Sequence, residues 1–551
     1  VIDPSWCRNP IDRFVLARLE REGQTPSPEA DRVTLLRRVA LDLTGLPPSV
    51  EEVRSFVEDD SPDAYSKRVD ELLSRKSYGE HMARYWADLV RLADTNGMHH
   101  DFYRNFSSYR SWLIRSFNDN LAFDEFIKYQ LAGDLYPEPT EDQLVASGFN
   151  RLHLIIDRGT ALPEESLHKN VLDRVQAFGT AFLGLTVQCA QCHDHKYDPI
   201  SQREFYQLYA FFNNFDGEPE TEKDPKGGIQ QPAISLSPST EDPTLAEVQA
   251  MVMRERSTPK PTFILERGSY EHPGAEVQRN IPAFLPPLKQ KDDYYTRLDL
   301  AEWLVDPDHP LTARVEVNRF WQQFFGVGLV KTSEDFGYQG QGPSHPELLD
   351  NLTLAFIESG WNVKQLVRAI VLSNTYRQSS DAAPEEFAKD PENRLLARGP
   401  RFRLDAEMIR DQILFVSGKL NQEMYGTSVK PPQPPGLWEA VSMAEPFTYV
   451  ADEGDAIYRR SFYTYWRRAM PPPQMTILNA PSREFCTARR ERTNTPLQAL
   501  LLMNEQEYFD AAQACARIVL EKSSGDPAQG LSMLHERITS HVPSEERLRQ
   551  M

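Results

Sequence analysis

Residues 35–49 read LLRRVALDLTGLPPS, and this stretch shows the pattern that decides the fold. Its apolar residues recur every three or four positions, which places them on one face of a helix: Leu35, Leu36, Val39 and Leu43. The sequence Thr-Gly-Leu-Pro-Pro at 44–48 then stops the helix, and Ser49 is suited to cap the next one. We therefore expect consecutive helices joined by sharp turns.

The same spacing recurs on both sides of this stretch, beginning at Pro10. We expect further helices over residues 62–74, 78–93, 108–119, 123–132, 164–184, 202–212, 311–325, 346–359, 363–373, 403–421 and 495–521. Between 216 and 293 prolines are frequent, and Thr262–Leu265 is typical of a short strand. The predicted fold is mainly α, with helical domains over 1–215 and 294–551 joined by a loop-rich segment, 216–293, that holds a few short strands.

The composition excludes some classes of function. Among 551 residues, Lys and Arg number 61 and Asp and Glu 81, which gives a net charge of −20. Such a charge repels phosphate backbones and argues against nucleic acid as the main partner. Mean hydropathy is −0.54, and no apolar run approaches the length of about 18 residues that a membrane span needs. We therefore expect no nucleic-acid partner and no membrane span.

Two of the five cysteines form a motif with defined chemistry, CAQCH at residues 189–193. In a CxxCH motif the two thiols add to the vinyl groups of a c-type haem, and the imidazole that follows ligates the iron. Cys189 and Cys192 would thus hold one haem c, with His193 as the proximal ligand. A zinc site would need four ligands, for which no second CxxC is present.

Two neighbours of the motif are candidates for a supporting role. His195 cannot reach the opposite face of the same iron. It is suited to hydrogen-bond a haem propionate, or to fix the loop together with Lys196 and the adjacent aspartates.

The motif also predicts where the protein works. Thioether attachment of haem takes place outside the bacterial cytoplasmic membrane, so we expect a periplasmic or extracellular protein. The sequence from Val1 to Pro4 is not that of a signal peptide, and we expect such a peptide to have been removed.

Several stretches carry a resemblance to a known family. They include GLTVQCAQCHDHKYDPI at 184–200, DLTGLPP at 42–48, QLAGDL at 130–135, NRFW at 318–321, PSHPELLD at 343–350 and RTNTPLQAL at 492–500. The chain resembles the planctomycete cytochrome-associated family that combines domains of unknown function 1549 and 1553. One departure is Asn479, where the family more often carries Asp; if that carboxylate binds a cation, this copy need not.

The resemblance implies an exported haem-c protein. Such proteins often have an additional cytochrome domain upstream and are encoded near sulfatases or polysaccharide-degrading enzymes. The implied partners are a redox protein or cytochrome domain and a carbohydrate-derived or other small polar substrate.

The segment 94–104 is the densest ionisable cluster of the first half, with Asp94, His99, His100, Asp101 and Arg104 around a glycine. Two carboxylates and two imidazoles suit Ca²⁺ or another divalent cation, a polar substrate pocket, or the distal face of the haem. The alternative is a solvated polar loop. A similar Gly-x-His in a family variant favours His99 over His100.

His168 lies near the start of the helix that leads to the haem motif. If the chain doubles back, this imidazole faces the iron opposite His193, as sixth ligand or as an acid–base group; a purely structural role is the alternative. His99 and Met98 are further candidates for the sixth ligand.

Positive charge gathers at Arg483, Arg489, Arg490 and Arg492. These arginines pair with the local Glu484 and Glu491, or they form a site for an anionic ligand.

Three functions remain open from the sequence. The first is an oxidoreductase that acts on its substrate at the haem iron, with Asp94, His99, Asp101, Arg104 and His168 as candidate catalytic residues. The second is an electron-transfer subunit docked to a partner dehydrogenase. The third is a binding or scaffold protein in which haem is structural.

Overall fold

A computed structural model describes residues 1–98, 100–156, 162–218, 226–238, 242–442 and 447–551. The first half is helical throughout. Its helices are α1 (Pro10–Arg21), α2 (Arg32–Thr44), α3 (Val50–Glu58), α4 (Ala64–Ser74), α5 (Lys76–Leu89), α6 (Ser107–Asn118), α7 (Phe123–Ala132), α8 (Glu141–Ala146), α9 (Pro163–Phe178) and α10 (Gln202–Phe212).

The turn between α2 and α3 shows how the sequence sets these boundaries. Gly45 ends α2 in the left-handed conformation, with φ +71°. Ser49 then caps α3: its side chain accepts a hydrogen bond from the backbone N–H of Glu52, whose carboxylate accepts one from the N–H of Ser49. The predicted stop and cap are both confirmed.

The middle segment forms two small antiparallel pairs of strands. β1 (Ala233–Ser235) pairs with β2 (Gln249–Met251), and β3 (Thr262–Leu265) pairs with β4 (Pro273–Val277). β3 is the strand predicted from the sequence. The mainly α fold with a few short strands is thereby confirmed.

The second half returns to helices. They are α11 (Arg297–Leu304), α12 (Thr312–Phe325), α13 (Pro346–Glu358), α14 (Val363–Leu372), α15 (Asn374–Arg377), α16 (Pro384–Lys389), α17 (Ala406–Val416), α18 (Leu437–Val441), α19 (Pro473–Ile477), α20 (Pro496–Asn504), α21 (Gln506–Lys522), α22 (Pro527–Thr539) and α23 (Glu545–Gln550). The single helix expected over 495–521 is wrong, because Glu505 adopts an extended backbone, φ −63° and ψ 127°, and separates α20 from α21.

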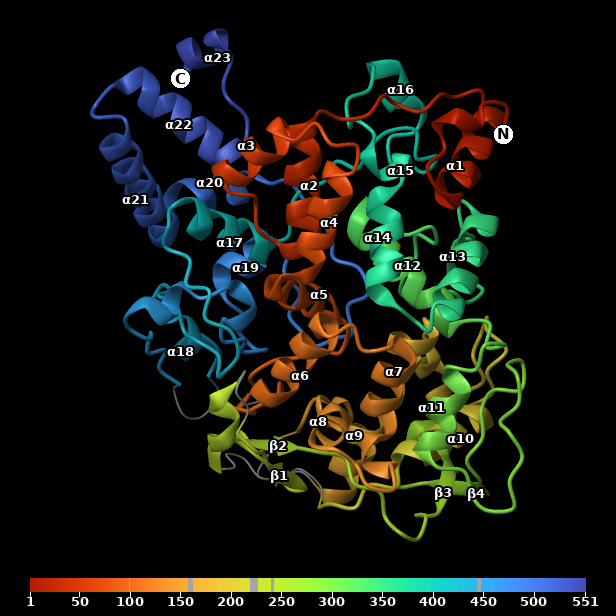
Figure 1. The fold of residues 1–551 in the computed structure, drawn as a ribbon. Coiled ribbons are helices and arrows are strands. Elements are labelled where there is room, and N and C mark those ends of the chain that lie inside the picture. Colours follow the sequence, from red (N-terminus) through yellow and green to blue (C-terminus); the bar gives the residue numbers. More distant parts are fainter. Residues whose placement is uncertain (99, 157–161, 219–225, 239–241, 443–446) are drawn as a thin grey trace.

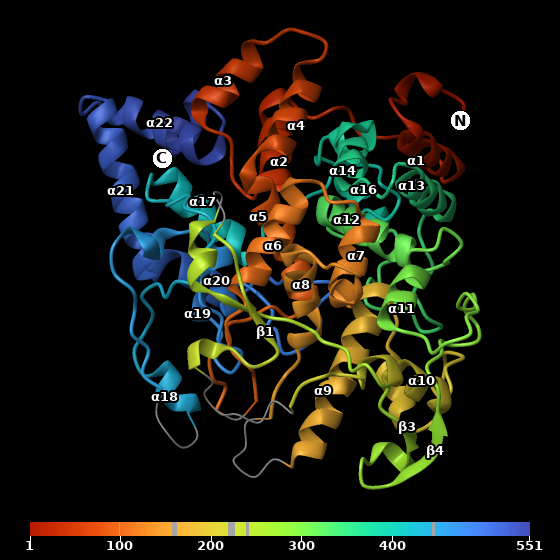
Figure 2. The ribbon, with the colours of Figure 1, turned by 60° about the horizontal axis from the view of Figure 1, so that its bottom comes forward.

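The two halves of the chain are interleaved. Helices α2 to α6 run through the middle of the molecule, with α11 to α14 and α16 on one side and α17 and α19 to α22 on the other (Figures 1 and 2). One continuous hydrophobic core extends through both halves, from Ile11 on α1 to Tyr463. No helix in the described ranges is long and apolar enough to cross a bilayer.

Candidate functional site

The CxxCH segment follows a tight reversal of the chain. After α9 comes one π-helical turn, η4 (Gly179–Leu183), and then Gly184 at φ +60°. A Cβ added at Gly184 would lie 2.9 Å from Cγ2 of Val315 on α12, so both the conformation and the space require glycine. The short 3₁₀ helix η5 (Val187–Gln191) then returns alongside α9 and α10.

The three residues of the motif lie on the surface. Cys189 and Cys192 are exposed, free thiols that form no disulfide, and His193 is also exposed. Nδ1 of His193 lies 2.7 Å from the carbonyl oxygen of Asp194. A carbonyl only accepts hydrogen bonds, so Nδ1 is the donor, and the neutral imidazole then has its lone pair on Nε2.

His195 and Lys196 lie in the loop that follows. The backbone N–H of Asp198 donates to Nδ1 of His195 at 2.8 Å, and the Asp198 carboxylate accepts from the backbone N–H of Tyr338 at 2.6 Å. The Lys196 ammonium lies over the ring of Tyr197. His195 thus holds a loop that the second half of the chain anchors.

His168 lies close to the motif, although its ring is already bound within the protein. Its Nδ1 is 3.1 Å from the hydroxyl of Tyr209, and the ring lies near the backbone of Gly268. A Cβ added at Gly268 would lie 3.1 Å from Sγ of Cys192. Gly268 therefore lies next to both His168 and this thiol. Burial lowers the pKa of His168 to about 4.

The segment 94–104 contacts the chain around Trp466 of the second half. The Asp94 carboxylate accepts hydrogen bonds from the Ser428 hydroxyl at 2.6 Å and from the backbone N–H of Trp466 at 2.7 Å. The Asp101 carboxylate accepts from the N–H groups of Gly97 at 2.6 Å and Ala469 at 2.8 Å. Both carboxylates therefore join the two halves of the chain.

The other candidates of this segment differ in their surroundings. Arg104 is buried and donates to the carbonyl oxygen of Tyr103 at 2.9 Å. Met98 is partly exposed, and His99 lies outside the described residues. Within the described part of the chain, no three or more His, Cys, Asp or Glu side chains form a group that could hold a metal ion. The cation at 94–104 stays a prediction, because His99 is one of its candidate ligands.

The arginines near residue 490 pair with distant acids. Arg490 binds Glu407 through two hydrogen bonds of 2.6 and 2.8 Å, and its Nε donates to Asp88 at 2.6 Å. Arg489 pairs with Glu334 instead. The expected pairing with Glu484 and Glu491 is wrong for these two arginines, because the fold brings acids of other segments to them.

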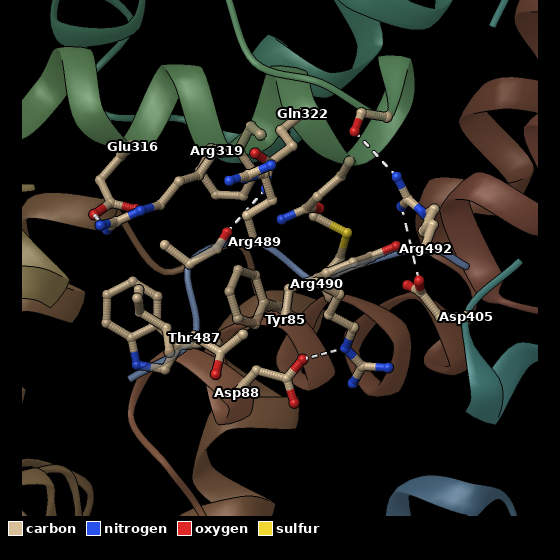
Figure 3. A pocket seen from close by; sticks show the side chains of 18 residues that line it. Tyr85, Asp88, Glu316, Arg319, Gln322, Asp405, Thr487, Arg489, Arg490 and Arg492 are labelled. Atoms are coloured by element: carbon tan, nitrogen blue, oxygen red, sulfur yellow. Dashed lines mark hydrogen bonds and ion pairs between the residues drawn. The ribbon is translucent and has the colours of Figure 1, made fainter. Parts of the chain in front are cut away.

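These arginines line a cavity of about 60 Å³ between α5, α12 and the segment 487–492. In Figure 3, Glu316, Arg319 and Gln322 project from α12 toward Tyr85 and Asp88 of α5, and the segment 487–492 passes between them. The sequence predicts an anion site at these arginines as one of two alternatives, but it does not indicate Glu316 and Tyr85, which the fold brings to the same cavity.

Two titratable groups in the cavity are strongly affected by burial. Burial raises the pKa of Glu316 to about 7, although Oε1 of Glu316 accepts a hydrogen bond from Nη1 of Arg319 at 2.8 Å. Burial also raises the pKa of Tyr85 to about 12. A carboxyl group that titrates near pH 7 inside a cavity is a common feature of functional sites.

Comparison with known proteins identifies two family matches. Residues 10–217 match the family PSCyt2, described as "Protein of unknown function (DUF1549)", and residues 296–551 match PSD1, "Protein of unknown function (DUF1553)". No curated protein and no solved structure matches the chain. The two domains of the predicted family pair are therefore both present.

Proposed function

We propose that this chain, which joins a DUF1549 domain to a DUF1553 domain, is an exported c-type haem protein that exchanges electrons at its surface. The observation that carries the proposal is the geometry of the CxxCH turn. Two uncombined thiols are exposed there, and the adjacent His193 keeps the lone pair of Nε2 available. These residues fit a covalently attached haem.

Each residue then has a defined task. Cys189 and Cys192 would hold the macrocycle, and Nε2 of His193 would ligate the iron. The hydrogen bond from Nδ1 of His193 to the Asp194 carbonyl oxygen orients the imidazole. The bound haem would supply one-electron redox chemistry. Since thioethers form outside the cytoplasmic membrane, the proposal includes a periplasmic or extracellular location.

Electron transfer is the form of this function that the geometry supports best. The motif is exposed, which favours contact with a redox partner protein or a cytochrome domain. The imidazole of His168 and the carboxylates of Asp94 and Asp101 are engaged in hydrogen bonds within the chain. These three side chains would have to break their hydrogen bonds before they could act at an iron.

The second candidate is an oxidoreductase that acts at the iron on a carbohydrate-derived or other small polar substrate. One observation favours it. His168 and Cys192 both lie next to Gly268, so a single glycine separates the imidazole from a thiol that would hold the haem.

The experiment begins with the protein expressed with export and cytochrome maturation. Haem that stays with the polypeptide in acid acetone and gives a c-type pyridine haemochrome is expected. Cys192→Ala should reduce attachment, whereas Cys515→Ser, which changes a buried thiol elsewhere, should not. Extractable haem, or none in the matured protein, contradicts the proposal.

The ferric spectrum of the same protein separates the three functions. Low-spin bands that persist in cyanide support electron transfer, and high-spin, cyanide-binding haem supports chemistry at the iron. A haem that neither exchanges electrons with a reductant nor binds cyanide indicates a structural group in a scaffold protein, against both redox forms.

A further inference from the structure

We propose that the cavity between α5, α12 and the segment 487–492 binds a short-chain monocarboxylate of two to four carbons. This site is separate from the CxxCH turn, and its argument does not depend on haem. It rests on the hydrogen-bond donors, the apolar wall and the size of the cavity.

The charged groups of the cavity favour an anion. Four arginines and three acids line it. The acids are already paired: Asp88 with Arg490, Asp405 with Arg492, and Glu316 with Arg319. Each of these acids is at most 5% exposed, and Oδ1 of Asp88 and Oε1 of Gln323 are buried acceptors without a hydrogen-bond partner in the described part of the chain. The preference for an anion therefore comes from the excess of arginines over acids.

Several donors are also without partners. Among the described residues, Nε of Arg319 and Nε of Arg492 are buried N–H groups without a hydrogen-bond partner. Arg319 is 93% buried, since 7% of its surface is exposed. The hydroxyl of Tyr85 makes no hydrogen bond with any described residue and borders the cavity. Buried donors without partners are costly, and a bound carboxylate would satisfy them.

Arg489 supplies a cation at the rim. Its side chain is 41% exposed, and its single ion pair is with Glu334, which is equally exposed. Exposed pairs of this kind contribute little energy. The guanidinium is therefore able to turn from Glu334 to an arriving carboxylate at small cost.

Part of the cavity wall is apolar. Trp86 and Leu89 of α5 and Phe320 of α12 line it and are buried in the core. An alkyl group packed here leaves water at a gain of about 25 cal/mol per Å². Sulfate or phosphate has no such group and would lose water without compensation on this wall. The combination of donors and an apolar wall selects a carboxylate with a short alkyl chain.

The volume limits the length of that chain. The cavity of about 60 Å³ is small, so acetate, propionate and butyrate suit it better than a larger ligand such as a monosaccharide.

Calorimetric titration of the full chain tests the proposal. The ligands are sodium propionate, the neutral isostere propionamide and sodium sulfate, at constant ionic strength. Propionate should bind one per chain and at least tenfold more tightly than either of the others. Propionamide binding as tightly would show that the charge is not recognised, and tighter binding of sulfate would assign the site to inorganic anions; both results overturn the proposal.

Two variants locate the binding. Tyr85→Phe removes a hydroxyl without a partner in the described structure, so the fold should be retained, and Arg489→Gln removes an exposed cation. Each should weaken propionate binding about tenfold to a hundredfold, the usual loss for a hydrogen bond to a charged group. The control Tyr338→Phe changes a tyrosine that is 81% exposed and should leave affinity unchanged. Absence of saturable binding, or equal affinity in all three variants, contradicts the site.

Discussion

Nη2 of Arg319 donates a hydrogen bond to the carbonyl oxygen of Thr180 at 2.5 Å, which ties α12 of the second half to the turn that leads into the CxxCH motif. Nη1 of the same guanidinium donates to the carbonyl oxygen of Ala181 and to Glu316. Because η4 ends one residue before the reversal at Gly184, this arginine fixes the start of the CxxCH segment. The DUF1553 part of the chain therefore helps to position the motif carried by the DUF1549 part.

Replacing Arg319 by Met should strongly destabilise the protein. The substitution leaves the Glu316 carboxyl and two carbonyl groups of η4 buried without their partner, and breaking a buried pair costs about 3–5 kcal/mol. The unfolding temperature, measured by calorimetry, should fall by several degrees. Arg489→Gln, which breaks an exposed pair, is the control and should leave it nearly unchanged. Equal stability of both variants would mean that Arg319 does not fix η4.

Buried histidines should make the protein labile to acid. Burial lowers the pKa of His309 to about 4, below the ordinary 6.5, so the unfolded chain binds the extra proton between these two values. Stability is therefore lost as the pH falls from about 6.5 to about 4. For one such histidine the loss is about 1.4 kcal/mol per pH unit. His168 and His345 have similarly lowered pKa values and act in the same direction.

The variant His309→Asn tests this effect at one position. Nδ1 of His309 accepts a hydrogen bond from the backbone N–H of Thr312 at 3.2 Å, and Asn retains an acceptor for it but does not titrate. The decline of the unfolding temperature between pH 6.5 and 4.5 should become shallower. His309→Ala should show the same shallower decline with lower stability at pH 7. If His309→Asn keeps the pH profile of the wild-type protein, His309 is not a source of the acid lability.

Part of this structure follows from local sequence, and part does not. The cap at Ser49 and the stop at Gly45 are predictable because both depend on neighbours within four residues. The partners of Arg490 are not, since Asp88 lies 402 positions away and only the folded chain brings the two together. Glu316 could not be predicted as a site residue for the same reason: its burial and its cavity come from three segments. The break at Glu505 shows that apolar periodicity alone does not locate the end of a helix.

Glu316 should have the opposite pH dependence from the histidines. Its pKa is raised to about 7 in the folded protein from an ordinary 4.5, so the folded state holds the extra proton. The favourable contribution is complete below about pH 4.5 and is lost as the pH rises through about 7. Relative to wild type, Glu316→Gln should therefore gain stability as the pH rises from 5 to 8, whatever the loss of the ion pair with Arg319 costs at both pH values. The difference in unfolding temperature between variant and wild type at these two pH values checks the sign, and a difference that moves against the variant as the pH rises would contradict it.

Gly184→Ala should disturb the CxxCH segment directly. Gly184 has φ +60°, a conformation that costs other residues about 1–2 kcal/mol, and a Cβ would lie 2.9 Å from Cγ2 of Val315. The matched control is Gly360→Ala, at φ +74° with no atom within 4 Å of the added Cβ, so it carries the backbone cost without the clash. Gly184→Ala should lower the unfolding temperature more than the control and should reduce covalent haem attachment, measured by the pyridine haemochrome per chain. We expect Gly360→Ala to retain full haem attachment. If both variants lose attachment equally, the cause is general instability. The close packing of Gly184 on α12 would then have no part in positioning Cys189 and Cys192.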